Sequence, residues 1–210
     1  MLQNEDKNQA TTARRRARAE RTKKMAEKTN NRGSLSKQDW LQAALEVLNQ
    51  RGISAVKVLP LSKKLGVTRG SFYWHFEDRD ELLREMLQYW EFELTDSVIN
   101  HARSLGAPPR ERLADVLTNV IRNRRHLYDT AMAAWGMFDE HAATSYARVL
   151  RKRLRFLSSL LMEAGVDQDQ VDFRARLILG FALSFGLGRG RATRADQLED
   201  VKRCCDMAFA

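Results

Sequence analysis

The sequence predicts an all-α protein of about nine helices, with an N-terminal three-helix head that contains a helix-turn-helix and a larger helical C-terminal body. Apolar residues recur every three or four positions along most of the chain, and no segment alternates apolar and polar residues as a strand would. Capping residues and glycines also mark where successive helices begin and end. A chain of 210 residues is long enough for a small head and one larger body.

Positive charge is concentrated at the N-terminus. The formal net charge is +9, and residues 1–35 hold ten Lys or Arg against four Asp or Glu, which accounts for +6 of it. Residues 1–34 are polar and contain almost no large apolar side chain, so we expect a disordered basic arm. Two interpretations stay open: a solvated tail, or an arm that reaches the phosphates or minor groove of DNA.

Several classes of protein are disfavoured by the composition. The two cysteines, Cys204 and Cys205, are adjacent, which suits ordinary thiols better than a disulfide framework or a zinc site. No apolar stretch follows the N-terminal charges as in a secretory signal, and the longest apolar run, residues 177–187, is shorter than the roughly 20 residues of a membrane span. We therefore expect a cytoplasmic protein that does not enter a membrane.

The first helix of the head is expected over residues 36–50. Ser36 and Asp39 form a capping-box pattern at its start, and Gly52 is a left-handed stop at its end. Its apolar stripe comprises Leu41, Ala44, Leu45 and Leu48.

The second and third helices are joined by a short turn. Residues 60–65 form the second helix, which Gly66 closes, and Thr68 is placed to cap a third helix that runs to Phe76. This third helix, about ten residues long, has Phe72 and Phe76 on its inner face. Two helices joined in this way form a helix-turn-helix, whose second helix can lie in a DNA major groove.

Residues 36–83 resemble the DNA-binding domain of TetR-type transcriptional regulators. The resemblance is carried by the segment Leu65-Gly66-Val67-Thr68-Arg69-Gly70-Ser71-Phe72-Tyr73-Trp74-His75-Phe76, followed by Arg79 and Leu82. It implies a disordered arm over residues 1–34, a DNA-binding domain over residues 35–80, and an effector-binding and dimerisation domain over residues 81–210.

The resemblance also implies contacts with double-stranded DNA. Arg69 is expected to read a guanine through two hydrogen bonds, and Trp74 to stack or touch a thymine methyl group. The other expected contacts are Thr68, Ser71, Tyr73, His75 and Arg79, which meet phosphates or base edges, and Gly70, which lets the backbone approach. Where many relatives have a Thr cap this chain has Lys57, which can still meet a phosphate, and where some have a base-contacting Arg it has Leu59.

One long helix is expected to connect the head to the body. Asp78 caps its start, and an apolar face continues from Leu83 to about Arg103. Residues 105–109 then form a break. The body helices are expected over residues 110–123, 125–137, 142–164, 168–186 and 196–209, the last with a capping box between Asp196 and Glu199.

The helix expected over residues 168–186 is apolar nearly all round between Leu177 and Phe185. One side can pack on the core and the other on a second copy, as in the family's dimerisation surface, although a central helix of a monomer would look the same. The residues expected at the dimer interface are Ile178, Phe181, Phe185, Leu198 and Val201.

A stripe of aromatic and Met residues in the body is either plain core or the lining of an effector pocket. The stripe comprises Tyr128, Met132, Trp135 and Phe138, and Trp90 is expected to join it from the connecting helix. The resemblance implies a small-molecule effector, and such a lining suits an apolar or amphipathic one.

Two further patterns are discounted. Residues 186–190 are glycine-rich but follow a helix rather than a strand, which excludes a phosphate loop. Asp139, Glu140 and His141 are adjacent and cannot converge on one metal ion, so they indicate a helix start. We therefore expect no catalytic residue, no cofactor and no metal.

The favoured hypothesis is a dimeric regulator, most consistent with a repressor that a small-molecule effector releases from a palindromic operator. The alternatives are a ligand-independent or architectural DNA-binding protein and, least favoured, an enzyme on a helical scaffold.

Overall fold

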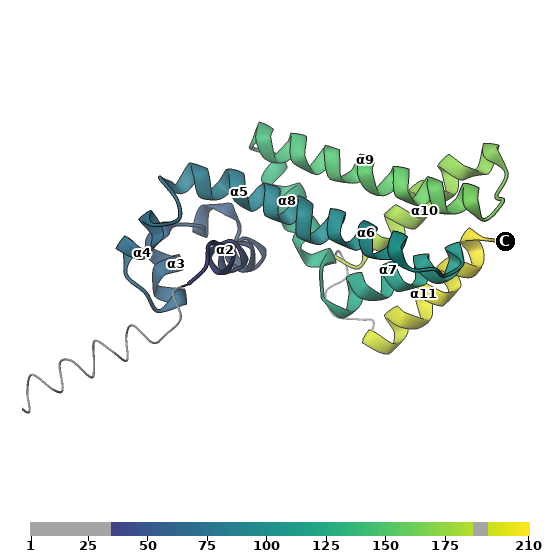
Figure 1. Cartoon of the computed structure of the whole chain (residues 1–210), viewed down its shortest axis with the longest axis horizontal. Helices are drawn as coiled ribbons and strands as arrows, with labels where there is room; N and C mark the ends of the chain where they lie inside the picture. The colour runs from purple at the N-terminus through teal and green to yellow at the C-terminus, as the bar shows by residue number, and fades with distance from the viewer. Residues whose placement is uncertain (1–34, 187–192) are drawn as a thin grey trace, which may run out of the picture. The chain divides into compact units, whose positions relative to one another are not determined.

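The computed structural model describes residues 35–186 and 193–210 (Figure 1). Within these two ranges every regular element is a helix and no strand is present, which confirms the predicted fold class. The chain divides into two units, Met1–Asp39 and Trp40–Ala210. The basic arm predicted for residues 1–34 lies outside the described residues.

The first head helix, α2, spans Lys37–Arg51. Its capping box is confirmed, because the Ser36 amide donates to Asp39 Oδ2 (2.7 Å) and the Asp39 amide donates to Ser36 Oγ (3.3 Å). Gly52 follows with a positive φ of 76°, a conformation that only glycine adopts without strain. A short 3₁₀ turn, η1 (Ile53–Ala55), leads to the next helix.

Helix α3 spans Val58–Leu65 and begins two residues earlier than expected, with Lys57 as its N-cap residue. The early start is possible because Pro60 then lies in the first turn, where backbone N–H groups have no helical acceptor to lose. Gly66 closes α3 in the left-handed region (φ 71°), as predicted.

Helix α4 is shorter than the sequence suggested: it spans Arg69–Tyr73, five residues rather than about ten. The chain tightens after Tyr73 because the Phe72 carbonyl accepts from both the His75 and Phe76 amides (2.9 and 3.0 Å). Thr68 is the N-cap residue, but its side chain makes no capping hydrogen bond.

The long connecting helix is not one regular α-helix. It consists of α5 (Arg79–Glu91), a π-helical turn η2 (Phe92–Asp96) and α6 (Ser97–Ser104). The Ser97 amide donates to the Phe92 carbonyl, five residues back, whereas an α-helix joins residues four apart. Asp78 caps α5 as predicted, accepting from the Glu81 amide (2.8 Å).

The body contains α7 (Pro109–Arg122), α8 (His126–Gly136), α9 (Glu140–Glu163), α10 (Gln168–Ser184) and α11 (Arg194–Ala208). Helix α9 packs against α8 and α10, and α7 packs against α11 (Figure 1). With α5, η2 and α6 taken as one rod, the two described ranges hold nine helices. Most of the glycine-rich loop at residues 186–190 lies outside those ranges.

The start of α11 differs from the prediction. The capping box joins Thr193 to Asp196, not Asp196 to Glu199, so the helix begins at Arg194. Either pair fits the sequence pattern, but only Thr193 has the extended backbone that an N-cap residue requires. Asp139 caps α9 as expected, because its side chain accepts from the Ala142 amide (2.9 Å).

Candidate functional site

The residues expected to contact DNA surround a small aromatic core in the head. Phe72 is fully buried and its ring lies edge-on to Trp40, with centroids 5.4 Å apart. Phe76 is also buried, 5.1 Å from Phe72. The predicted inner face of the third helix is confirmed, and α4 owes its position to these two side chains rather than to its own length.

The polar and aromatic residues of this segment face outward. Trp74 is 88% exposed although it is a large aromatic residue, and Tyr73 is also exposed. Thr68, Arg69 and Gly70 are exposed and adjacent, while Ser71 and His75 are half-buried. An exposed cluster of cationic, hydroxyl and aromatic groups on a firmly packed helix has the chemistry of a DNA-reading surface.

Helix α3 presents a cation and an apolar side chain near its start. Lys57 is exposed and forms no side-chain cap, and Leu59 is half exposed. Lys57 can therefore meet a phosphate. Leu59 offers no hydrogen bond to a base.

Arg79 has a structural role that the sequence did not indicate. Its Nε donates to the Val56 carbonyl (2.7 Å) and its Nη2 donates to the Ile53 carbonyl (3.2 Å). The guanidinium thus ties the start of α5 to the connection between α2 and α3. This contact depends on tertiary structure, and no local pattern signals it. The expected phosphate contact stays a prediction.

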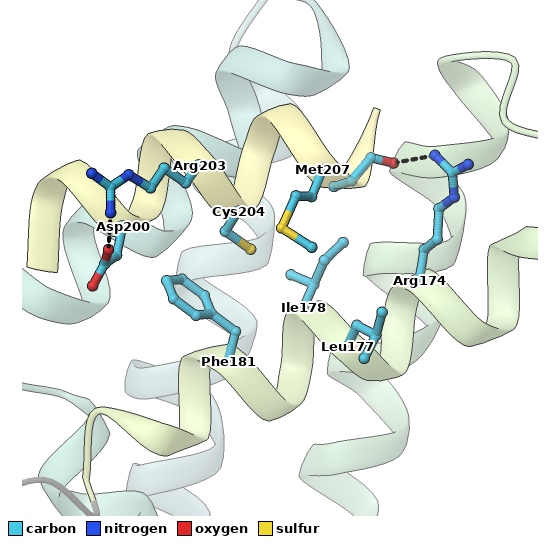
Figure 2. A pocket seen from close by; sticks show the side chains of 9 residues that line it. Arg174, Leu177, Ile178, Phe181, Asp200, Arg203, Cys204 and Met207 are labelled. Atoms are coloured by element: carbon cyan, nitrogen blue, oxygen red, sulfur yellow. Dashed lines mark hydrogen bonds and ion pairs between the residues drawn. The ribbon is translucent and has the colours of Figure 1, made fainter. Parts of the chain in front are cut away.

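Helices α10 and α11 form an apolar groove on the surface (Figure 2). Leu177, Ile178 and Phe181 line it from α10, and Cys204 and Met207 line it from α11. Leu177 is 52% exposed and Met207 is 72% exposed, so two large apolar side chains face solvent in the single chain. The groove is therefore suited to covering by another apolar surface.

The residues predicted for the dimer interface are divided between this surface and the interior. Ile178 and Val201 are almost completely buried in the core of the body, at 3% and 2% exposure. Phe181, Phe185 and Leu198 are half-buried at its edge. The sequence missed Leu177 and Met207, because a helix that is apolar on both sides does not reveal which side faces its own core.

Comparison with known proteins supports the same assignment for the head. Residues 41–86 match the family model "Bacterial regulatory proteins, tetR family". The chain is 29% identical over 99 residues to the HTH-type transcriptional regulator AcrR of Shigella flexneri, covering 47% of this chain and 46% of that protein. It is 40% identical over 63 residues to the HTH-type transcriptional regulator SrpR of Pseudomonas putida, covering 30% of each. These matches span less than half the length of the curated relatives.

The fold similarity extends over the body. A transcriptional regulator of Aquifex aeolicus VF5 aligns with 84% of this chain and 100% of its own, with a TM-score of 0.67 and 18% identity. The resemblance to TetR-type regulators is thereby confirmed for residues 41–86. At 18% identity, the shared fold of the body does not specify a ligand, so the ligand must be argued from the residues of this chain itself.

The aromatic and Met stripe of the body does not form one surface. Trp90, Met132 and Trp135 are buried, Tyr128 is half-buried, and Phe138 is 88% exposed at the end of α8. Phe138 is separated from the others because the chain turns at residues 137–139 to start α9. An effector contact for these residues stays a prediction.

A cavity of about 60 Å³, partly open to solvent, lies elsewhere in the body, between η2, α6, α7, α8, α9 and α10. Its wall is apolar except for Thr95, Asp129 and Arg153. Arg153 donates from Nη1 to Asp129 Oδ2 (2.7 Å), from Nη2 to Asp129 Oδ1 (3.0 Å), and from Nε and Nη2 to Thr95 Oγ1 (3.2 and 3.1 Å). Asp129 was detectable in the sequence as the one acidic residue of α8, whereas Arg153 was hidden among the many cations of α9.

A second charged cluster joins the connecting helix to α9. Glu91 accepts from Arg148 (2.7 Å) and Lys152 (2.7 Å), and Lys152 also donates to Asp96 (2.7 Å). Burial alone would raise the pKa of Glu91, but the hydrogen bonds and charges of Arg148 and Lys152 outweigh it and lower the pKa from its usual 4.5.

Within residues 35–186 and 193–210, no three His, Cys, Asp or Glu residues gather as a metal site would require. No helix in those ranges is long and apolar enough to span a bilayer.

Proposed function

We propose that the protein is a dimeric DNA-binding transcriptional regulator, and that it acts as a repressor whose operator affinity a small molecule lowers. The observation that carries this proposal is the tetR family match over residues 41–86, which includes the outward-facing segment from Thr68 to His75. In this reading Arg69 reads bases, while Thr68, Tyr73 and His75 hold the phosphate backbone.

Dimerisation is supported by the way helix-turn-helix proteins bind DNA and by the groove between α10 and α11. A helix-turn-helix dimer binds two half-sites one helical turn apart, so the bodies of two copies must pair to hold their two heads at this spacing. The exposed Leu177 and Met207 supply an apolar surface that a second copy can cover around a two-fold axis.

Effector control requires a contact that differs between two states of the body. The connecting rod of α5, η2 and α6 provides a route, because it begins at the head with Arg79 and forms one wall of the cavity at η2 and α6. A molecule that enters the cavity can act on the head through this rod.

Selection of bound fragments from the source genome at physiological salt tests the proposal. A regulator is expected to enrich one palindromic site with a large ratio of specific to non-specific affinity. Uniform recovery of fragments would support an architectural protein instead and would refute sequence-specific regulation.

Two variants then test the assigned contacts. Arg69→Ala should relax base preference within each half-site by about 1–3 kcal/mol, whereas Tyr73→Phe should weaken all sites alike. An Arg69→Ala protein with unchanged preference would remove Arg69 from base reading.

Deleting residues 1–34 tests the basic arm. If the arm contacts phosphates, the deletion lowers DNA affinity and reduces the slope of log affinity against log salt. An unchanged slope would show that the arm is a solvated tail.

A further inference from the structure

The cavity between η2, α6, α7, α8, α9 and α10 has a balanced pair of charges in its wall. Among the described residues that line it, Asp129 and Arg153 are the only charged ones, and Asp129 is 5% exposed. Four of the five guanidinium N–H groups of Arg153 are directed at Asp129 or Thr95. The wall therefore presents no uncompensated charge to a ligand.

The rest of the wall is apolar and comes from helices far apart in sequence. It includes Val98 and Ile99 of α6, Leu117 of α7, Phe156 of α9 and Leu179 of α10, all of them buried. A charged ligand placed here would lose its hydration and find both wall charges already paired, a penalty that a neutral ligand avoids.

We propose that the cavity is the effector site and that it selects small neutral, predominantly apolar molecules over anions or cations of the same size. This inference names the ligand class of the regulator proposed above and rests on that function for its regulatory consequence. The polar corner at Thr95, Asp129 and Arg153 offers one hydroxyl-sized group of the ligand a hydrogen bond.

The cavity must widen to admit such a ligand. Its volume is about 60 Å³, whereas an apolar cavity that binds benzene measures about 150 Å³. Of the walls, η2 and α6 belong to the rod that leads to the head. Contacts from outside the rod hold η2 in place, because Arg125 donates to the Glu93 carbonyl (2.7 Å) and Arg153 donates to Thr95, so a ligand that widens the cavity there must loosen these contacts. Widening the cavity at η2 displaces the rod that leads to the head.

A matched series of three ring-sized probes tests the ligand class: benzyl alcohol, benzoate and benzylammonium. Each is titrated into the DNA-free full chain by calorimetry at pH 7, where the three are neutral, negative and positive. Benzyl alcohol is expected to bind at least tenfold more tightly than either charged probe. Equal or tighter binding of a charged probe, or no binding of benzyl alcohol, would overturn the proposal.

Two charge variants shift the expected selectivity in opposite directions. Asp129→Asn leaves Arg153 uncompensated and should raise the affinity of benzoate relative to benzyl alcohol by at least tenfold. Arg153→Met leaves Asp129 uncompensated and should favour benzylammonium in the same way. Asp115→Asn on α7 and Arg151→Met on α9 change the same charges at exposed positions and should alter neither ratio.

Ala182→Leu locates the binding site. Ala182 lines the cavity from α10, so a larger side chain there should fill it and abolish benzyl alcohol binding. Unchanged binding in this variant would place the probe elsewhere and refute the site assignment.

Operator affinity is measured separately, with and without benzyl alcohol. If the chain binds benzyl alcohol in the cavity but does not recognise an operator, the proposed regulator function is refuted and the proposed ligand class is not. A chain that recognises an operator but binds no neutral probe would refute the ligand class alone.

Discussion

Replacing Phe72 by alanine should destabilise the head, whereas replacing Trp74 by alanine should leave stability unchanged and weaken DNA binding. The two aromatic residues are two positions apart, but Phe72 is fully buried and Trp74 is 88% exposed. The two substitutions therefore separate the packing that holds residues 68–76 in place from the side chain that this segment is proposed to present to DNA.

The expected cost at Phe72 follows from its surroundings. Phe→Ala substitutions in cores cost about 3–5 kcal/mol, which combines lost burial and the cavity left behind. Phe72 also loses its edge-on contacts with Trp40 and Tyr73, at 5.4 and 5.3 Å, and an aromatic pair contributes about 1 kcal/mol beyond its burial. We expect a loss of about 4 kcal/mol, a large part of the roughly 5–15 kcal/mol that stabilises a typical domain.

The assay is urea unfolding at one fixed protein concentration, followed by the far-ultraviolet signal, with binding to a selected operator fragment as the second measurement. Trp74→Ala should change unfolding by no more than about 0.5 kcal/mol while it weakens operator binding at least tenfold. A Trp74→Ala protein that unfolds as readily as Phe72→Ala, or a Phe72→Ala protein as stable as the parent, would refute the division of roles.

Three other predictions concern the body. Leu177→Glu should shift the protein from dimer to monomer in sedimentation measurements, whereas Gln168→Glu, which adds the same charge at an exposed position of α10, should not. Glu91→Gln should cost about 1 kcal/mol of stability at pH 7, because Arg148 and Lys152 lose the charge of their shared partner but both keep access to solvent. The pKa of Glu91 is lowered in the folded state, so its contribution to stability is complete above about pH 4.5 and is lost as the pH falls through the folded pKa. The difference in unfolding free energy between Glu91→Gln and the parent, measured by urea unfolding, should therefore shrink between pH 6 and pH 3. Burial, and to a lesser extent Cys205, raises the pKa of Cys204 to about 11. Cys204 should therefore react with iodoacetamide at pH 8 at least tenfold more slowly than a free thiol, and an equal rate would contradict this raised pKa.

Local signals predicted the head well because the features concerned are local. The capping box of Ser36 and Asp39, the left-handed stops at Gly52 and Gly66, and the inner face of Phe72 and Phe76 each depend on residues within a few positions of one another. The spacing of the two Phe residues also predicted that the polar residues between Thr68 and His75 lie away from this inner face.

The groove between α10 and α11 and the cavity could not be predicted from local signals. Ile178 and Leu177 are neighbours in an apolar run, yet Ile178 is in the core and Leu177 faces solvent. When both sides of a helix are apolar, periodicity alone does not show which side faces the core. The cavity brings together side chains from six elements, so its composition is a property of the tertiary packing.

The π-helical turn has a physical cause that joins these observations. In an α-helix two residues five apart lie about 140° apart around the axis, so Glu91 and Asp96 would face different neighbours. A π-turn bonds residue i to residue i+5 and brings such residues closer to one face. Lys152 Nζ lies 2.7 Å from a carboxylate oxygen of each, so both acids do face α9. Paired charges on α9 therefore favour the π-turn over the α-helix that the apolar pattern of this segment predicts, and the same turn carries Thr95 into the wall of the cavity.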